Sequence, residues 1–171
     1  MALYLTTPKR RYRRAWEQFT QELGKDHTRI FVLFEEKKAY WQFLRKWKNF
    51  HTGRHLPRGA VPVTEYFLME EGRPKILGVV NICHRITEDM LATDGHIYYA
   101  VAPSERRKGY ATQQLRLALD ICREMGIGPV LVTCDRDNIA SAKVIQNNGG
   151  VLEDERMSGD GRVFQRYWIT L

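Results

Sequence analysis

The sequence has few cysteines and no long apolar run. Only three of its 171 residues are cysteine, Cys83, Cys122 and Cys134. Their spacing matches neither a metal site nor a disulfide framework, so we expect three reduced, buried thiols and no bound metal. No apolar stretch approaches the ~20 residues that a membrane helix needs, and the N-terminus lacks the apolar core of a signal peptide. These absences predict a soluble, cytoplasmic protein without a membrane partner.

What is present is typical of one globular domain, which we expect to span residues 1–171. Hydrophobic residues make up 43% of the chain and charged residues 27%. Charge is uneven, because residues 1–60 hold 14 Lys/Arg and 5 Asp/Glu, or +9, whereas the remainder carries −2. A basic N-terminal third can steer an acidic substrate or a nucleic acid. The cations alternate with an apolar stripe, which favours the solvated faces of two helices over a nucleic-acid partner.

The segment from His96 to Gly126 predicts a strand, a basic loop and a helix. His96–Val101 is rich in aromatic and β-branched residues, and a run of cations around Gly109 follows it. Apolar residues then recur at helical spacing until Gly126. The first N–H groups of a helix lack intrahelical partners and the helix dipole adds positive charge there, so this loop predicts a phosphate or pyrophosphate site. The loop has neither the P-loop nor the dinucleotide spacing of glycines.

The loop Arg106-Arg107-Lys108-Gly109-Tyr110-Ala111 resembles the acetyl-CoA loop of the GCN5-related N-acetyltransferases (GNATs), Gln/Arg-x-x-Gly-x-Gly/Ala. It lies five residues beyond Val101, as in that family. A second resemblance is an asparagine that opens a later helix, at Asp137-Asn138, with Ser141 three residues further on. The alternative for the loop alone is a solvated run of charge at an ordinary helix start.

The order of predicted elements is also that of the family, β-α-α-β-β-β-α-β-α-β-β. Strands are expected at 3–6, 61–70, 75–85, 96–101, 130–134, 151–157 and 163–171. Helices are expected from Thr7-Pro8 to Gly24, over 35–50, from the loop that ends at Ala111 to Gly126, and over 139–148. Residues 30–34 fit a strand or a helix, and 51–60 and 86–95 fit loops. The resemblance implies an α/β GNAT fold, with a central mixed, mainly antiparallel sheet of six to seven strands and about four helices. The strand at 130–134 is expected beside 96–101, in parallel.

The resemblance implies a binding site for acetyl-CoA. Two parallel strands part at a bulge, and the backbone of Tyr99 and Val101 pairs with the pantetheine arm. The N–H groups of the loop hold the pyrophosphate, with Gly109 and Ala111 allowing close approach and Arg106 and Lys108 adding positive field. These donors belong to Arg107, Lys108, Gly109, Tyr110, Ala111 and Thr112. Asn138 is expected either to bond the pantetheine arm or only to cap its helix, and Ser141 lies beside it.

Direct attack of an amine on the thioester needs a proton acceptor and a proton donor. Many relatives carry a tyrosine donor seven residues after the signature asparagine, but this chain has Ile145 there. Tyr98 or Tyr99 can replace it, although strand packing also explains both. Glu65 and His96 are the candidate bases. The simpler interpretation of Glu65 is a solvated carboxylate, and that of His96 is a histidine at the end of a strand that bonds a neighbouring loop. His84 is a third candidate.

We therefore expect an acetyl-CoA-dependent N-acetyltransferase. The predicted acceptor is a small-molecule amine lodged between the first two helices and the central strands. Two alternatives stay open: a protein or aminoacyl-tRNA amine, which the basic N-terminal third favours, and a non-catalytic acyl-CoA sensor, which Ile145 favours. The oligomeric state is left open by the sequence, a homodimer included.

Overall fold

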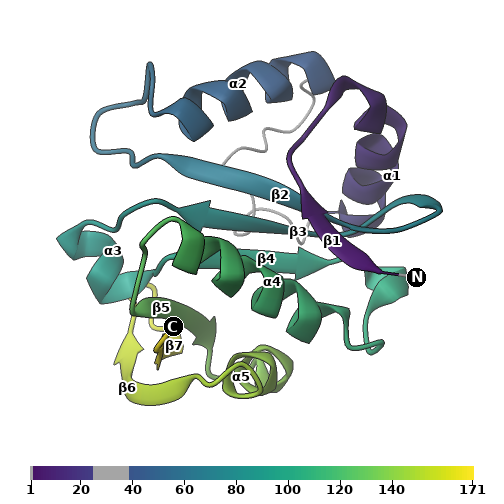
Figure 1. Ribbon diagram of the computed structural model, residues 1–171. Helices are drawn as coiled ribbons and strands as arrows, with labels where there is room; N and C mark the ends of the chain where they lie inside the picture. Colours follow the sequence, from purple (N-terminus) through teal and green to yellow (C-terminus); the bar gives the residue numbers. More distant parts are fainter. Residues whose placement is uncertain (1, 25–38) are drawn as a thin grey trace.

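The computed structural model describes residues 2–24 and 39–171. In chain order these form β1 (Leu3–Thr6), η1 (Arg10–Tyr12), α1 (Arg13–Leu23), α2 (Tyr40–Thr52), β2 (Val63–Glu70), β3 (Arg73–Cys83), α3 (Glu88–Thr93), β4 (Ile97–Val101), η3 (Pro103–Glu105), α4 (Tyr110–Glu124), β5 (Val130–Asp135), α5 (Ile139–Gln146), β6 (Val151–Met157) and β7 (Val163–Ile169). The strands lie in two antiparallel sheets, β1-β2-β3-β4 and β5-β7-β6 (Figure 1).

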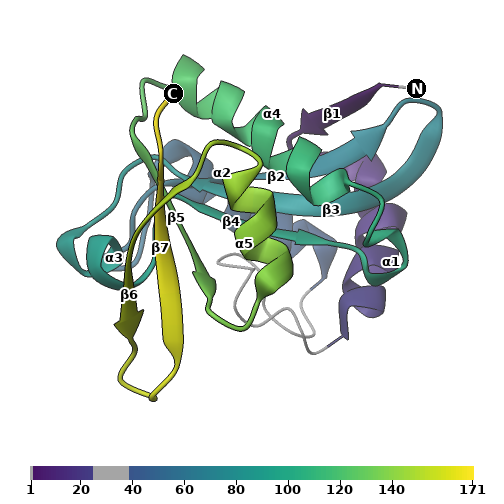
Figure 2. The same cartoon turned by 90° about the horizontal axis from the view of Figure 1, so that it is seen from below.

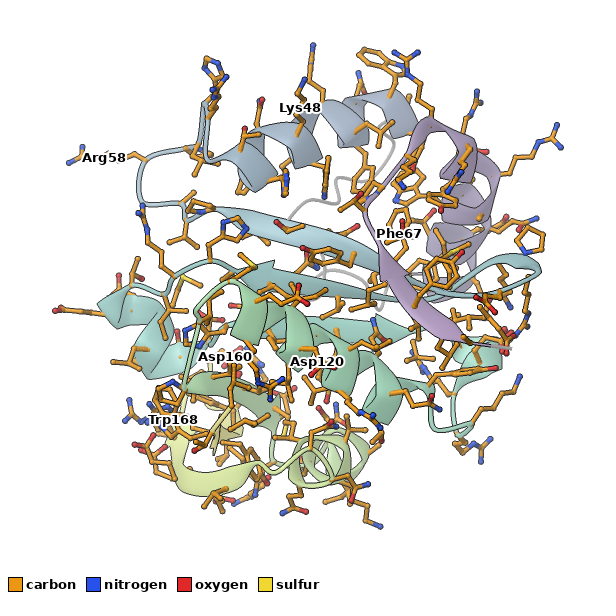
Figure 3. All side chains as sticks on the ribbon, in the orientation of Figure 1. Lys48, Arg58, Phe67, Asp120, Asp160 and Trp168 are labelled. Atoms are coloured by element: carbon orange, nitrogen blue, oxygen red, sulfur yellow. The ribbon has the colours of Figure 1, made fainter. Side chains whose placement is uncertain are left out.

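Helices α1 and α2 cover one face of the four-stranded sheet (Figure 1). The stripe expected on the first helix is buried there: Tyr12, Ala15, Trp16, Phe19 and Leu23. The ring of Trp16 stacks on Phe43 of α2 with centroids 5.2 Å apart, and Phe43 stacks in turn on Phe67 of β2 at 6.3 Å. Phe67 points from β2 into this layer (Figure 3). Aromatic packing therefore holds the two helices on the sheet.

Helices α4 and α5 lie on the opposite face, next to the three-stranded sheet (Figure 2). Their apolar side chains share one core with both sheets, because Leu115 and Ala118 of α4 and Ile145 of α5 pack with Val80 of β3 and Tyr167 of β7. This core joins the two sheets through side chains. Cys83, Cys122 and Cys134 are free and buried, as expected.

The two sheets meet through their backbones at one point. Within the described residues, one backbone hydrogen bond links them, from His96 N to the carbonyl of Leu131 on β5 at 2.8 Å. The ring Nδ1 of His96 accepts a second bond from Leu131 N at 3.0 Å. Gly95 permits this approach, because a Cβ there would lie 2.6 Å from the Leu131 oxygen. We call the facing edges of β4 and β5 beyond this contact the strand junction.

Several sequence-based expectations need correction. The single central sheet is two sheets, and β5 meets β4 only at its start. Residues 86–95 contain the helix α3, capped by the Thr87 hydroxyl, which accepts from Met90 N at 3.2 Å. Helix α1 begins at Arg13, after a 3-10 turn, and does not begin at Thr7-Pro8. The expected segment at 30–34 and the start of the helix at 35–50 lie outside the described residues.

The bulge that the family resemblance implied is not found in the pairing of β4. Val101 to Ile97 pair with Gly78 to Ile82 in an unbroken register, whereas register shifts occur between Leu68 and Glu70 and between Leu152 and Asp154. The contact at His96 and Leu131 therefore sets where β4 and β5 part. None of the helices in the described segments has the length and apolarity of a membrane span.

Candidate active site

The loop before α4 presents a row of free backbone donors. The first backbone bond of the helix runs from Gln113 N to the Gly109 carbonyl at 3.2 Å, and Arg106 N bonds the Pro103 carbonyl at 3.4 Å. Between them, the N–H groups of residues 107–112 meet no acceptor in the described part of the chain. Six consecutive unpaired donors at the positive end of a 15-residue helix form a strong anion site.

Backbone conformation aims these donors outward. Arg107 and Gly109 have φ of 61° and 81°, the left-handed region, so the chain reverses sharply before the helix. Alternation of this kind gathers successive N–H groups into a concave nest. A Cβ on Gly109 would meet nothing within 4 Å, so the space in front of the nest is open to a ligand. Glycine is required here for its φ and leaves room for close approach.

A buried carboxylate lies beneath this loop. Glu105 is 2% exposed and bonds Arg73 Nη2 at 2.5 Å, Lys75 Nζ at 2.8 Å and Lys108 Nζ at 3.0 Å. Burial alone would raise the pKa of Glu105, but the bonds to these three cations lower it to about 2. This cluster was not predicted from the sequence, where its signal is a single acidic residue next to a run of cations. The side chains of Arg106 and Arg107 remain exposed beside it.

The free edge of β4 offers the backbone of Tyr99 and Val101. Two bonds show which residues of β4 direct their backbone groups toward β3. Cys83 N donates to the His96 carbonyl and Ala102 N to the Leu77 carbonyl, both at 2.8 Å. Even-numbered residues of β4 therefore pair with β3, and odd-numbered ones point their backbone toward the strand junction. Arg106 Nε lies 3.4 Å from the Val101 carbonyl. The residues chosen from the sequence thus present their backbone groups to the junction.

The side chains of Tyr99, Asn138 and Ser141 meet on the other side of the junction. The Tyr99 hydroxyl lies 2.8 Å from Ser141 Oγ, and Asn138 Oδ1 accepts from Ser141 N at 3.1 Å. Asn138 therefore does cap α5, as one of the two interpretations held. Burial raises the pKa of Tyr99 to about 12, partly offset by the Ser141 bond. Ile145 is fully buried in the core.

The histidine candidates are engaged in structural bonds. Because Nδ1 of His96 accepts from Leu131 N, its proton lies on Nε2, and the ring has no free lone pair to act as a base. Burial lowers the pKa of His96. The Thr64 hydroxyl bonds both His51 Nδ1 and His84 Nε2 at 2.8 Å, and burial also lowers the pKa of His84. These bonds disfavour both His96 and His84 as the base.

Glu65 is a fully buried carboxylate on the face of β2 that α2 covers. Neither of its oxygens meets a donor at good geometry in the described residues. Burial raises the pKa of Glu65 to about 8, although the Asn81 amide and the charge of Lys46 act to lower it. Glu65 pairs across the sheet with Asn81, which pairs with Tyr98. A polar row thus crosses the sheet toward the strand junction, about 10 Å away at two strand spacings.

The comparisons with known proteins agree with this geometry. A family model described as "Acetyltransferase (GNAT) domain" matches residues 9–151. RimL, described as a ribosomal L7/L12 alpha-N-protein acetyltransferase, is 19% identical with a TM-score of 0.68 over 99% of this chain and 90% of its own. YncA, a putative acetyltransferase from Salmonella typhimurium solved with acetyl-CoA, is 13% identical with a TM-score of 0.68 over 100% of this chain and 95% of its own.

A third solved structure extends the range of acceptors among these neighbours. Mutant forms of the spermidine/spermine N-acetyltransferase SpeG from Vibrio cholerae are 15% identical with a TM-score of 0.64, over 99% of this chain and 95% of their own. No curated protein sequence matches this chain significantly. At these identities the likeness to solved structures shows the fold alone. The seven strands and interleaved helices of residues 2–24 and 39–171 confirm the expected fold class.

Proposed function

Because this chain belongs to the GNAT acetyltransferase family and depends on acetyl-CoA, we propose that it transfers the acetyl group directly to a primary amine. The observation that carries the proposal is the row of six free N–H groups at residues 107–112, next to the unpaired edge of β4. The loop would hold the diphosphate, and Tyr99 and Val101 would pair with the pantetheine amides. The Tyr99 N–H would then polarise the thioester carbonyl.

Glu65 is the proposed base. Its pKa of about 8 lies close to the operating range of a general base, and the row through Asn81 leads to the strand junction. The distance across two strands means that the proton would travel through Asn81 or a water molecule. A rate that rises with pH to an apparent pKa near 8, and loses this rise in Glu65→Gln, would support the assignment.

The proposed acceptor is a small-molecule amine at the α1/α2 side of the sheet, and the charge there disfavours a polycation. Residues 2–24 and 39–60 hold ten Lys/Arg and two Asp/Glu, and nine of the ten cations are exposed. Lys48 on α2 and Arg58 in the following loop lie at the outer edge of the molecule (Figure 3). An amine that also carries a carboxylate or phosphate would be attracted to this surface.

The same surface favours a second candidate, an amine on an acidic protein or an aminoacyl-tRNA. A thiol-release assay with amino acids, nucleotide amines, polyamines, peptides and aminoacyl-tRNA distinguishes these acceptors. Turnover with small anionic amines supports the first proposal, and turnover only with a macromolecule, falling steeply with salt, supports the second. Coenzyme A binding without thiol release from acetyl-CoA in the presence of any of these acceptors would favour the non-catalytic sensor.

A further inference from the structure

The side chain of Tyr99 spans the strand junction from β4 to α5. Its hydroxyl meets Ser141 Oγ at 2.8 Å, and the Ser141 carbonyl lies 3.5 Å from the same oxygen. Ser141 is itself held by the Asn138 cap at the start of α5. The phenol therefore has a fixed position beside the β4 edge to which its own N–H belongs.

Acetyl transfer needs a proton at the sulfur of coenzyme A. The carbon–sulfur bond breaks as the carbon–nitrogen bond forms, the amine loses one proton, and the departing thiolate gains one. Ile145, which stands where many relatives have a tyrosine, is apolar and fully buried, so it cannot supply that proton. On the α5 side of the junction, the protic side chains include those of Tyr99, Ser141 and Cys134, whose thiol is buried beside Ser141.

We propose that Tyr99 is the proton donor to the departing coenzyme A sulfur and that Ser141 is the positioning residue that orients the Tyr99 hydroxyl. This inference rests on the proposed acetyl transfer. The electron pair of the broken carbon–sulfur bond becomes the S–H bond, and the tyrosinate regains a proton from solvent. The proton that the amine loses goes to Glu65, the proposed base. One residue thereby serves the thioester twice, through its N–H at the carbonyl oxygen and through its hydroxyl at the sulfur.

The protonation states of Tyr99 and Cys134 are compatible with a hydrogen bond from Tyr99 to the coenzyme A sulfur. The pKa of Tyr99 is raised to about 12 by burial, so the hydroxyl carries its proton throughout the neutral range. Burial likewise raises the pKa of Cys134 to about 11, and its thiol stays neutral. Neither group brings a negative charge next to the forming thiolate, so a hydrogen bond from Tyr99 stabilises that thiolate without opposition.

The test compares Tyr99→Phe and Ser141→Ala with the matched control Tyr66→Phe, which removes a half-buried hydroxyl on the same side of the sheet, away from the junction. The first readout is the pKa of the thiol of bound coenzyme A, taken from the pH dependence of its alkylation by iodoacetamide and detected as the coenzyme A thioether. We expect Tyr99→Phe to raise this pKa by roughly 1–2 units. The second readout is kcat, which should fall about 10²-fold with little change in KM for acetyl-CoA.

Each outcome separates the inference from the proposed function. If the wild type releases no thiol with any amine, the proposed function fails. If it turns over but Tyr99→Phe keeps the wild-type thiol pKa and kcat, the inference alone is overturned. A loss in Ser141→Ala with no loss in Tyr99→Phe overturns it as well, because Ser141 would then be the donor. A smaller shift in Ser141→Ala than in Tyr99→Phe, with Tyr66→Phe unchanged, supports it.

Discussion

Replacing Glu65 by glutamine should stabilise the protein at neutral pH while removing activity. The carboxyl is fully buried and its pKa is raised from 4.5 to about 8, so the folded state holds a proton that the unfolded state has released. A raised folded pKa gives stability that is complete below pH 4.5 and is lost as the pH rises through 8. Glutamine has nearly the same shape and does not titrate.

The size of the effect follows from this difference in pKa. Since pH 7 lies 2.5 units above the unfolded-state pKa of 4.5, the ionisable carboxyl lowers the free energy of unfolding by about 3 kcal/mol at that pH, at 1.36 kcal/mol per unit. Glu65→Gln should therefore match the wild type in unfolding free energy near pH 4 and exceed it by about 3 kcal/mol at pH 7. Its kcat should fall about 10²-fold if Glu65 is the base.

Urea denaturation at pH 4, 5.5 and 7 measures this difference, with Glu71→Gln in the exposed β2–β3 turn as the control. The control should show no pH-dependent gain. A difference between Glu65→Gln and the wild type that stays constant from pH 4 to 7 would refute the reasoning, because it would show that Glu65 is ionised in the folded protein. A stable variant with wild-type kcat would leave the burial argument intact and remove Glu65 as the base.

Three further substitutions test other parts of the structure. Gly109→Val places a side chain at a φ of 81°, at a strain of about 1–2 kcal/mol. It should lower coenzyme A affinity at least tenfold by calorimetry while the circular dichroism spectrum stays native, and equal affinity would contradict the loop site. Gly95→Ala sets a Cβ 2.6 Å from the Leu131 oxygen and should lower the free energy of unfolding, measured by urea denaturation, by about 2 kcal/mol. An unchanged free energy of unfolding would show that the two sheets separate easily. Gln114→Leu removes a buried amide whose two polar atoms lack partners in the described residues, and the free energy of unfolding should rise by about 1 kcal/mol; a fall would reveal a bond to Gln114.

Elements with a strong periodic pattern could be predicted from the sequence, and contacts between distant segments could not. The apolar stripe of α1 and the strand before Gly109 are encoded locally, so their burial and order follow from spacing alone. Helix α3 has six residues and buries none of them, so it leaves no apolar period to detect. The division into two sheets depends on the meeting of Gly95 and Leu131, which no local pattern reports.

The candidate site shows the same contrast. The loop around Gly109 was predictable because its glycine, its cations and its helix are contiguous. Glu105 was overlooked because Arg73 and Lys75, which bind it, come from a strand some thirty residues earlier. The bonds that engage His96 also come from a distant strand, so its chemical type alone indicated a base.

The ionic contacts of Glu105 tie strand β3, the turn η3 and the basic loop into one rigid unit. The three like charges are therefore brought together while the chain folds, and a diphosphate that binds at the proposed site would meet a surface already in its final shape. Little conformational entropy remains to be lost at that moment, which favours rapid capture. It also means that Arg73, far from the loop in sequence, helps to set how firmly an anion is held.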